Sequence, residues 1–242
     1  MAQLLNPRQL TGREETHLVE LPAGHRLQAA AAAAFAQLQQ DARAAGFDLA
    51  IASSFRSYSR QLLIWNGKAS GLRKVHDDAG REFDISTLAG PEKLRAILRY
   101  SAIPGTSRHH WGTDLDVYDL AAVAPGYRLE LSPAEVAPGG IFDPLHRWLD
   151  ERMAAGESRG FYRPYTVDRG GVAPERWHLS YAPLALGCEP GLSERLLQAC
   201  WEECTAGEEA LLLAEEIKAQ LPLIMATYIA VTAGWCPAHY PA

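Results

Sequence analysis

Hydrophobic and polar positions along the chain follow two periods, one typical of helices and one typical of strands. Residues 25–45 carry an alanine-rich pattern with interspersed Leu and Gln, which predicts a strong helix that ends before Gly46. Amphipathic segments at 58–66, 91–100 and 143–155 predict three shorter helices. These helices alternate with strand-like segments, so the pattern indicates a protein of mixed helices and strands.

Alternating, β-branched or aromatic segments predict four strands, at residues 47–53, 113–118, 161–165 and 175–181. In the second of these, Leu115 and Val117 face one side of the strand, while Asp114, Asp116 and Tyr118 face the other. Two aspartates on one face of a strand need a cation, hydrogen-bond donors or water beside them. Long polar connections at 67–90 and 119–142 are expected to shape a pocket.

The composition shifts towards the C-terminus. Residues 191–219 predict one or two helices with an acidic, solvent-facing side, and residues 222–232 have the apolar content of a buried strand. We therefore expect a single domain over residues 1–242, with a catalytic core at about 25–185 and a helix–strand extension at 186–242.

Composition and charge exclude some classes of partner. The chain has 242 residues, of which 48% are hydrophobic and 21% charged, and its formal net charge is -6. An acidic chain is a poor match for nucleic acid, which favours a basic surface. No run reaches the roughly 18 apolar residues of a membrane span. The N-terminal residues lack the long apolar region of a signal peptide, so we expect a cytoplasmic protein if the chain is complete, and a periplasmic or envelope protein if a leader was removed.

Four cysteines occur in the C-terminal quarter. Cys200 and Cys204 lie four residues apart in a helical pattern, whereas Cys188 and Cys236 bracket the last segment. A disulfide between the outer pair remains open, because connectivity cannot be derived from sequence. We expect all four to be free thiols that pack as small apolar groups.

Two separate stretches carry metal-ligand chemistry. The first places His109 in a glycine-flanked loop and Asp116 on the strand that follows, and the second contains Glu175 and His178. Three ligands of mixed nitrogen and oxygen type suit zinc, and a catalytic zinc site keeps a fourth position for water. We therefore predict that His109, Asp116 and His178 bind the metal and that Glu175, unbound beside it, is the general base.

Other readings of these residues stay open. Adjacent histidines point in different directions on a strand, so His109 and His110 are not expected to bind one ion together, and a buried or capping role is the alternative for either. A second cluster of His76, Asp77 and Asp78 lacks any nearby residue that would complete a coordination shell.

The motifs resemble those of a known family. They are Ser107-x-His109-x-x-Gly112-x-x-x-Asp116, the downstream Glu175-x-x-His178, and Ser54-Phe55-Arg56-Ser57-Tyr58 with Gln61. This set is similar to that of the zinc D-alanyl-D-alanine carboxypeptidase family, which includes the vancomycin-resistance D,D-peptidases and related L,D-carboxypeptidases. The resemblance covers roughly residues 47–182. The resemblance and the pattern of hydrophobic positions together imply an α+β fold of the hedgehog and D,D-peptidase type. In this fold a small, mainly antiparallel sheet carries the zinc site, and helices surround the sheet.

The resemblance also implies roles for single residues. His109, Asp116 and His178 match the zinc ligands, and Glu175 matches the general base. Arg56 matches an arginine that steadies the substrate and the oxyanion. Ser107 and Gln61 match polar groups that hold the peptide.

Two positions depart from the family pattern. Asp114 stands where alanine is usual and Ser54 replaces a common glycine. Asp114 either orients a metal ligand from outside the coordination shell or adds a negative charge that favours a cationic substrate group.

The implied activity is removal of a terminal D-alanine from peptidoglycan stem peptides, at a D,D or an L,D bond, with zinc as cofactor and peptidoglycan-derived peptides as partners. A peptidoglycan endopeptidase is one alternative. The other is a non-catalytic module that binds zinc or wall peptide, which the presence of Glu175 disfavours, because a structural zinc site needs no free base and usually has four protein ligands.

Overall fold

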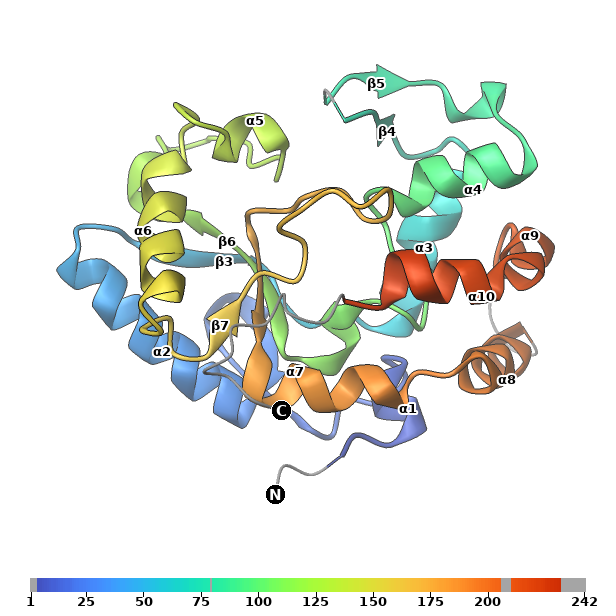
Figure 1. Ribbon diagram of the computed structural model, residues 1–242, viewed down its shortest axis with the longest axis horizontal. Helices are drawn as coiled ribbons and strands as arrows, with labels where there is room; N and C mark the ends of the chain where they lie inside the picture. The colour runs from blue at the N-terminus through green and yellow to red at the C-terminus, as the bar shows by residue number, and fades with distance from the viewer. Residues whose placement is uncertain (1–3, 79, 206–209, 232–242) are drawn as a thin grey trace.

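The computed structural model describes residues 4–78, 80–205 and 210–231, and a four-stranded antiparallel sheet lies at its centre (Figure 1). The strand order is β3 (Leu49–Ser53), β6 (Asp114–Asp119), β8 (His178–Tyr181) and β7 (Phe161–Tyr162). All four predicted strands are therefore confirmed; three are shorter than predicted, and β6 is shifted by one residue. The mainly antiparallel α+β fold expected from the sequence is confirmed as well.

Two helices cover the apolar face of this sheet. They are α2 (Ala29–Ala44), which contains the alanine run, and α6 (Asp143–Ala154). Phe35 and Leu38 of α2 pack with Leu115 and Val117 of β6, and all four are buried. The small side chains of the alanine run let the helix lie close to the strands. Residues 26–28, which the pattern assigned to the start of this helix, instead form β2 (Arg26–Gln28), because they pair with β1 (Leu18–Glu20) in a two-stranded sheet.

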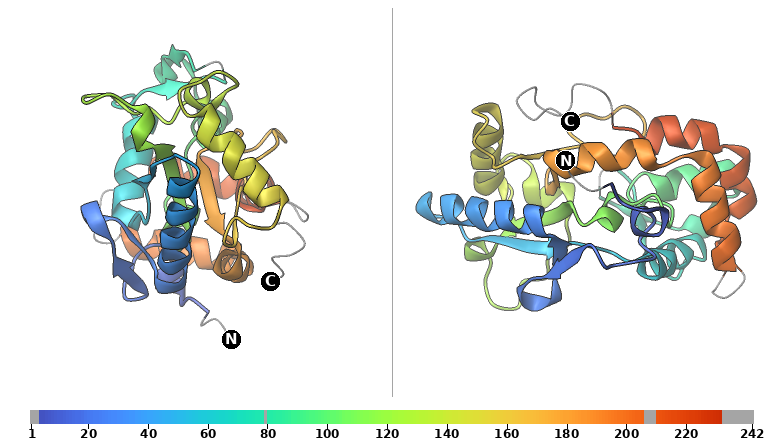
Figure 2. Two further views of the ribbon diagram at one scale, coloured as in Figure 1. Left: turned by 90° about the vertical axis from the view of Figure 1, so that its left-hand side faces the viewer. Right: turned by 90° about the horizontal axis from the view of Figure 1, so that it is seen from below.

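A second core lies beside the sheet, where α3 (Tyr58–Ala69) and α4 (Gly90–Leu98) pack against the C-terminal helices. Figure 2 shows α2 and α6 at one end of the molecule and the C-terminal helices at the other. Trp65 of α3 is fully buried and its indole N–H donates to the carbonyl of Leu212, 2.9 Å away. The C-terminal segment is thus attached directly to the helix that follows β3.

The predicted strand at 222–232 is wrong for the residues that the structure describes. They form α10 (Leu221–Ile224) and a π-helical turn, η6 (Met225–Ile229), whereas residue 232 lies outside the described ranges. Pro222 sits in the first turn of α10, where its missing N–H costs nothing. Leu221 and Ile224 pack into the second core. A short apolar run fits a buried helix as well as a strand, so periodicity alone could not separate the two.

Of the remaining elements only α8, with 12 residues, is as long as α3 and α6. They comprise α1 (Pro7–Leu10), β4 (Val75–His76) paired with β5 (Glu82–Phe83), α5 (Pro133–Val136), α7 (Ala182–Cys188), α8 (Glu194–Thr205), α9 (Ala214–Ala219) and the 3-10 turns η1 (Pro22–Gly24), η2 (Ile85–Thr87), η3 (Arg108–Trp111), η4 (Leu120–Ala122) and η5 (Glu189–Gly191). Among the described helices, none combines the length and the apolar character that crossing a membrane requires.

Three of the four cysteines are free thiols, as expected. Cys188 and Cys200 are buried and Cys204 is half-buried. Cys236 lies outside the described residues. Because Cys188 is a free thiol, the Cys188–Cys236 disulfide that the sequence left open is not formed.

Candidate metal centre

Three side chains from separate parts of the chain converge beside the central sheet. His109 lies in the 3-10 turn η3, Asp116 lies in β6, and His178 begins β8. Antiparallel pairing places Asp116 directly opposite His178. His109 Nε2 lies 3.4 Å from Asp116 Oδ2, and His178 Nδ1 lies 3.3 Å from Asp116 Oδ1. One ligand atom from each residue lies within 4.8 Å of the other two.

These distances fit a tetrahedral zinc ion. Bonds of about 2.0–2.1 Å in a tetrahedron separate neighbouring ligand atoms by about 3.4 Å. Here each histidine nitrogen lies at about such a distance from one oxygen of Asp116, His178 Nδ1 at 3.3 Å from Oδ1 and His109 Nε2 at 3.4 Å from Oδ2. Three protein ligands also leave one position for water, as in catalytic zinc sites.

Each histidine is oriented by a bond at its other ring nitrogen. His109 Nδ1 lies 2.9 Å from the carbonyl oxygen of Ser54, and His178 Nε2 lies 2.9 Å from Asp114 Oδ1. Such partners fix the tautomer and leave the opposite nitrogen free to bind a cation. His109 therefore offers Nε2 and His178 offers Nδ1.

The charges around the site favour a cation. Burial raises the pKa of Asp116, but His109 and His178 more than reverse this effect and hold it well below its ordinary value. Burial lowers the pKa of His178, but hydrogen bonds to Asp114 and Asp116 raise it to about 10. Burial also lowers the pKa of His109, which stays neutral. The pocket thus holds an anionic ligand and stabilises positive charge beside it.

Asp114 contacts the predicted metal ligand His178 and does not line the cleft. Its carboxylate is fully buried and accepts hydrogen bonds from Arg108 Nε (2.9 Å), Thr113 Oγ1 (2.6 Å) and Ser180 Oγ (3.1 Å). These contacts favour the first of the two readings of Asp114, in which it orients His178. With no exposed surface it cannot meet a cationic substrate group.

Asp114→Asn is expected to weaken zinc binding by about 10- to 100-fold, because an amide accepts the His178 hydrogen bond less strongly. Competition with a chromophoric chelator measures this loss. Asp119→Asn is the matched control, since Asp119 lies on the same strand but bonds only to the backbone N–H groups of Asp48 and Ala121. Equal affinity in Asp114→Asn and wild type would remove Asp114 from the support of the metal site.

Glu175 lies next to the cluster without joining it. Its Oε2 is 3.6 Å from His178 Nδ1, and the side chain keeps 15% of its surface exposed. Burial raises the pKa of Glu175 to about 7; the nearby Asp116 acts in the same direction, whereas His178 and Arg56 oppose it. A carboxylate that is half protonated near neutral pH is suited to exchange protons.

Arg56 lies behind the cluster on the segment between β3 and α3. Its guanidinium donates to Gln61 Oε1 (2.9 Å) and Ser53 Oγ (3.2 Å), and burial lowers its pKa although Asp116 and Glu175 act in the opposite direction. Arg56 and Ser107 both line the cleft. Gln61 does not line it: its side chain is fully buried and its amide N–H donates to the carbonyl of Ala102. Gln61 thus positions Arg56 and cannot itself touch a peptide in the cleft.

The cleft over the metal centre has a volume of about 730 Å³. One rim is formed in the β4–β5 segment by Lys74, His76, Asp77, Gly80 and Glu82, and the other by residues 128–133, as the two long polar connections predicted. Its walls also contain Lys68 and Tyr165, which sequence reasoning did not select. The ring of Tyr165 packs edge-on against His178 with 5.2 Å between centroids. No sequence motif marks a single lysine in a helix as a residue that lines a cleft.

The second histidine of the pair is structural. His110 Nε2 accepts from the backbone N–H of Gly105 (3.0 Å), and its Nδ1 lies 2.6 Å from the carbonyl of Arg56. A Cβ at Gly12 would meet His110 Nδ1 at 2.4 Å, so the N-terminal segment can cover this ring only with glycine there. His110 therefore ties the Arg56 segment to the loop that carries His109.

The alternative cluster of His76, Asp77 and Asp78 does not gather as a metal site. Asp77 pairs with Arg81 at 2.8 Å and Asp78 with Arg99 at 2.7 Å. In the part of the chain that the structure describes, the grouping of His109, Asp116 and His178 alone meets the geometry of a metal site.

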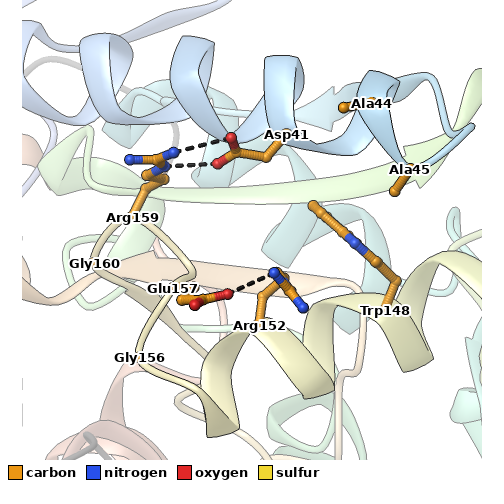
Figure 3. A pocket seen from close by; sticks show the side chains of 9 residues that line it. All are labelled: Asp41, Ala44, Ala45, Trp148, Arg152, Gly156, Glu157, Arg159 and Gly160. Atoms are coloured by element: carbon orange, nitrogen blue, oxygen red, sulfur yellow. Dashed lines mark hydrogen bonds and ion pairs between the residues drawn. The ribbon is translucent and has the colours of Figure 1, made fainter.

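A groove of about 900 Å³ lies between the C-terminal ends of α2 and α6 (Figure 3). Its charges are paired within the protein, since Arg159 binds Asp41 at 2.6 and 2.9 Å and Arg152 binds Glu157 at 2.5 Å. None of the predicted site residues lines this groove.

Comparisons with known proteins agree with the motifs. The sequence profile of the VanY family, described as D-alanyl-D-alanine carboxypeptidase, matches residues 24–184. Two uncharacterized proteins of Haemophilus influenzae are similar in sequence. One is 52% identical over 103 residues, or 41% of this chain and 70% of the relative, and the other is 33% identical over 129 residues, or 52% and 92%.

Solved structures with a related arrangement include VanYB in complex with D-alanine-D-alanine, at 23% identity and a TM-score of 0.48 over 81% of this chain and 92% of that one. Another is the LD-carboxypeptidase LdcB, at 21% identity and a TM-score of 0.48 over 78% and 80%. Because the family profile spans well over half of its length, the chain belongs to the VanY family of D-alanyl-D-alanine carboxypeptidases.

Proposed function

We propose that the protein is a zinc-dependent carboxypeptidase that removes the terminal D-alanine of peptidoglycan stem peptides. The observation that carries this proposal is the position of Glu175. Its carboxylate lies 3.6 Å from the Nδ1 atom that His178 offers to the metal, yet the other three residues already supply a complete set of protein ligands. A purely structural metal site has no use for a free carboxylate there.

The residues fit zinc through His109 Nε2, the Asp116 carboxylate and His178 Nδ1. When bound, zinc supplies a Lewis acid that lowers the pKa of water towards ~7 and polarises a carbonyl oxygen. Glu175 accepts a proton from the attacking water and then donates it to the departing amine. Its raised pKa makes both transfers feasible near neutral pH.

Arg56 is the available donor for the negative charge that develops on the scissile carbonyl oxygen. Its guanidinium is held by Gln61 and Ser53, so little reorganisation is needed when the charge forms. Ser107, the N-cap residue that precedes η3, also lines the cleft and can hold the peptide backbone. We therefore assign Arg56 and Ser107 as residues that contact the substrate, whereas Gln61 holds the Arg56 side chain in position.

Incubation of zinc-loaded protein with defined tripeptide, tetrapeptide and pentapeptide stems tests the proposal. Mass spectrometry is expected to show loss of one alanine, from the pentapeptide for a D,D bond or from the tetrapeptide for an L,D bond. A chelator should stop the release and added zinc should restore it. Intact peptides in every case would overturn the proposal.

The same assay separates the alternatives. An endopeptidase would release internal fragments from cross-linked stems and leave the terminal residue in place. A binding module would retain peptide without changing its mass.

A further inference from the structure

Lys68 of α3 lies in the wall of the cleft with an uncompensated charge. It follows Gln61 by seven residues, so the two side chains lie on one face of the helix about two turns apart. Its Nζ donates to Ser101 Oγ at 2.6 Å. An ammonium group has three N–H donors, and the described residues accept only this one.

No carboxylate of the described residues forms an ion pair with Lys68. Lys74, which also lines the cleft, differs because it pairs with Glu82 at 2.6 Å. Burial lowers the pKa of Lys68 to about 8; Glu175 opposes this shift, and Arg56 and Arg73 add to it. The side chain is still mainly cationic at neutral pH, and burying an unpaired charge is costly.

Hydrogen bonds tie Lys68 and, through Gln61, Arg56 to two adjacent residues of the chain, Ser101 and Ala102. Arg56 donates to Gln61, Gln61 donates to the carbonyl of Ala102, and Ser101 accepts from Lys68. The wall beside Glu175 thus presents two fixed cations. A purely structural bond to Ser101 does not require a charge, since a neutral donor would serve as well.

We propose that Lys68 is a specificity-determining residue that binds a carboxylate of the substrate peptide. This inference rests on the proposed function and deepens it. A stem peptide offers two sources of carboxylate, the C-terminus and the side chain of a diaminopimelate at the third position. The charge-assisted bond is the same for both.

Isothermal titration calorimetry of the zinc-loaded Glu175→Gln protein tests this assignment, with and without Lys68→Met. The ligands are pentapeptide stems as free acids or C-terminal amides, each with diaminopimelate or lysine at the third position. Lys68→Met is expected to weaken binding of the recognised carboxylate at least about tenfold. Loss confined to the free acids identifies the C-terminus, whereas loss confined to the diaminopimelate peptides identifies the side chain.

Equal loss for all four peptides, or no loss, would overturn the role of Lys68. Lys93→Met is the matched control, since Lys93 donates to the carbonyl of Ala69 at the end of the same helix but does not line the cleft. Lys68→Gln replaces Lys68→Met if the latter fails to fold, and Lys68→Arg should recover part of the affinity. The cleavage assay tests the proposed function separately: if that function is wrong, the wild-type protein cleaves no stem peptide.

Discussion

Glu175→Gln is expected to lower kcat for hydrolysis of a D-alanine-terminated stem peptide by about 100- to 10,000-fold, with little change in zinc content. Glutamine keeps the shape of the side chain but cannot accept a proton from water. Glu175 is not one of the three ligands, so the metal should stay in place. Single-turnover assays on zinc-loaded protein measure the loss, and elemental analysis measures the zinc.

Glu151→Gln provides the control, because Glu151 lies on the exposed side of α6 and is not among the described residues that line the cleft. It should retain wild-type turnover. Hydrolysis by Glu175→Gln at the wild-type rate would exclude Glu175 as the base and leave the mechanism without its proton carrier.

His178→Ala is expected to abolish stoichiometric zinc binding and, with it, turnover. The substitution removes one of three protein ligands and also leaves Asp114 and Asp116 facing each other without the imidazole between them. Elemental analysis after dialysis against micromolar zinc measures the occupancy, and circular dichroism establishes that the variant is folded.

His76→Ala is the matched control for this loss. His76 is exposed and lines the same cleft, but belongs to a cluster whose carboxylates bind arginines. It should keep one zinc per chain. Full occupancy in His178→Ala would contradict the ligand assignment.

The grouping of His109, Asp116 and His178 could be predicted because these residues fall in short motifs with fixed spacing. Asp116 and His178 are each placed by local strand geometry, and one antiparallel register brings them together. The role of Asp114 could not be assigned, because its orientation depends on Arg108, a residue six positions away whose guanidinium turns back onto the strand. Sequence alone could not separate an orienting carboxylate from a charge in the cleft.

Other features depend on contacts that no local pattern records. Gln61 matches a substrate-binding glutamine, yet the packing of α3 buries it behind Arg56. Lys68 belongs to no sequence motif. Its position in the cleft wall depends on tertiary structure, which brings Ser101 against its side chain. The apolar run at 221–229 is helical and buries its side chains in the same core as α3 and α4.

That residues 1–242 form a single domain remains a prediction, and two sets of contacts made by the C-terminal residues support it. The C-terminal residues of the proposed extension contribute Tyr228 to the cleft lining. The side chain of Asn66 also bonds to the backbone at both Ala210 and Leu212. We therefore expect the core at about 25–185 and the extension to unfold together as one domain over residues 1–242.

Anomalous diffraction at the zinc absorption edge, from crystals grown with zinc, tests the central claim most directly. We expect one peak bonded to His109 Nε2, the Asp116 carboxylate and His178 Nδ1, with the Glu175 carboxylate beside it and not coordinated. No peak at these three residues, or a peak with Glu175 as a fourth protein ligand, would contradict it.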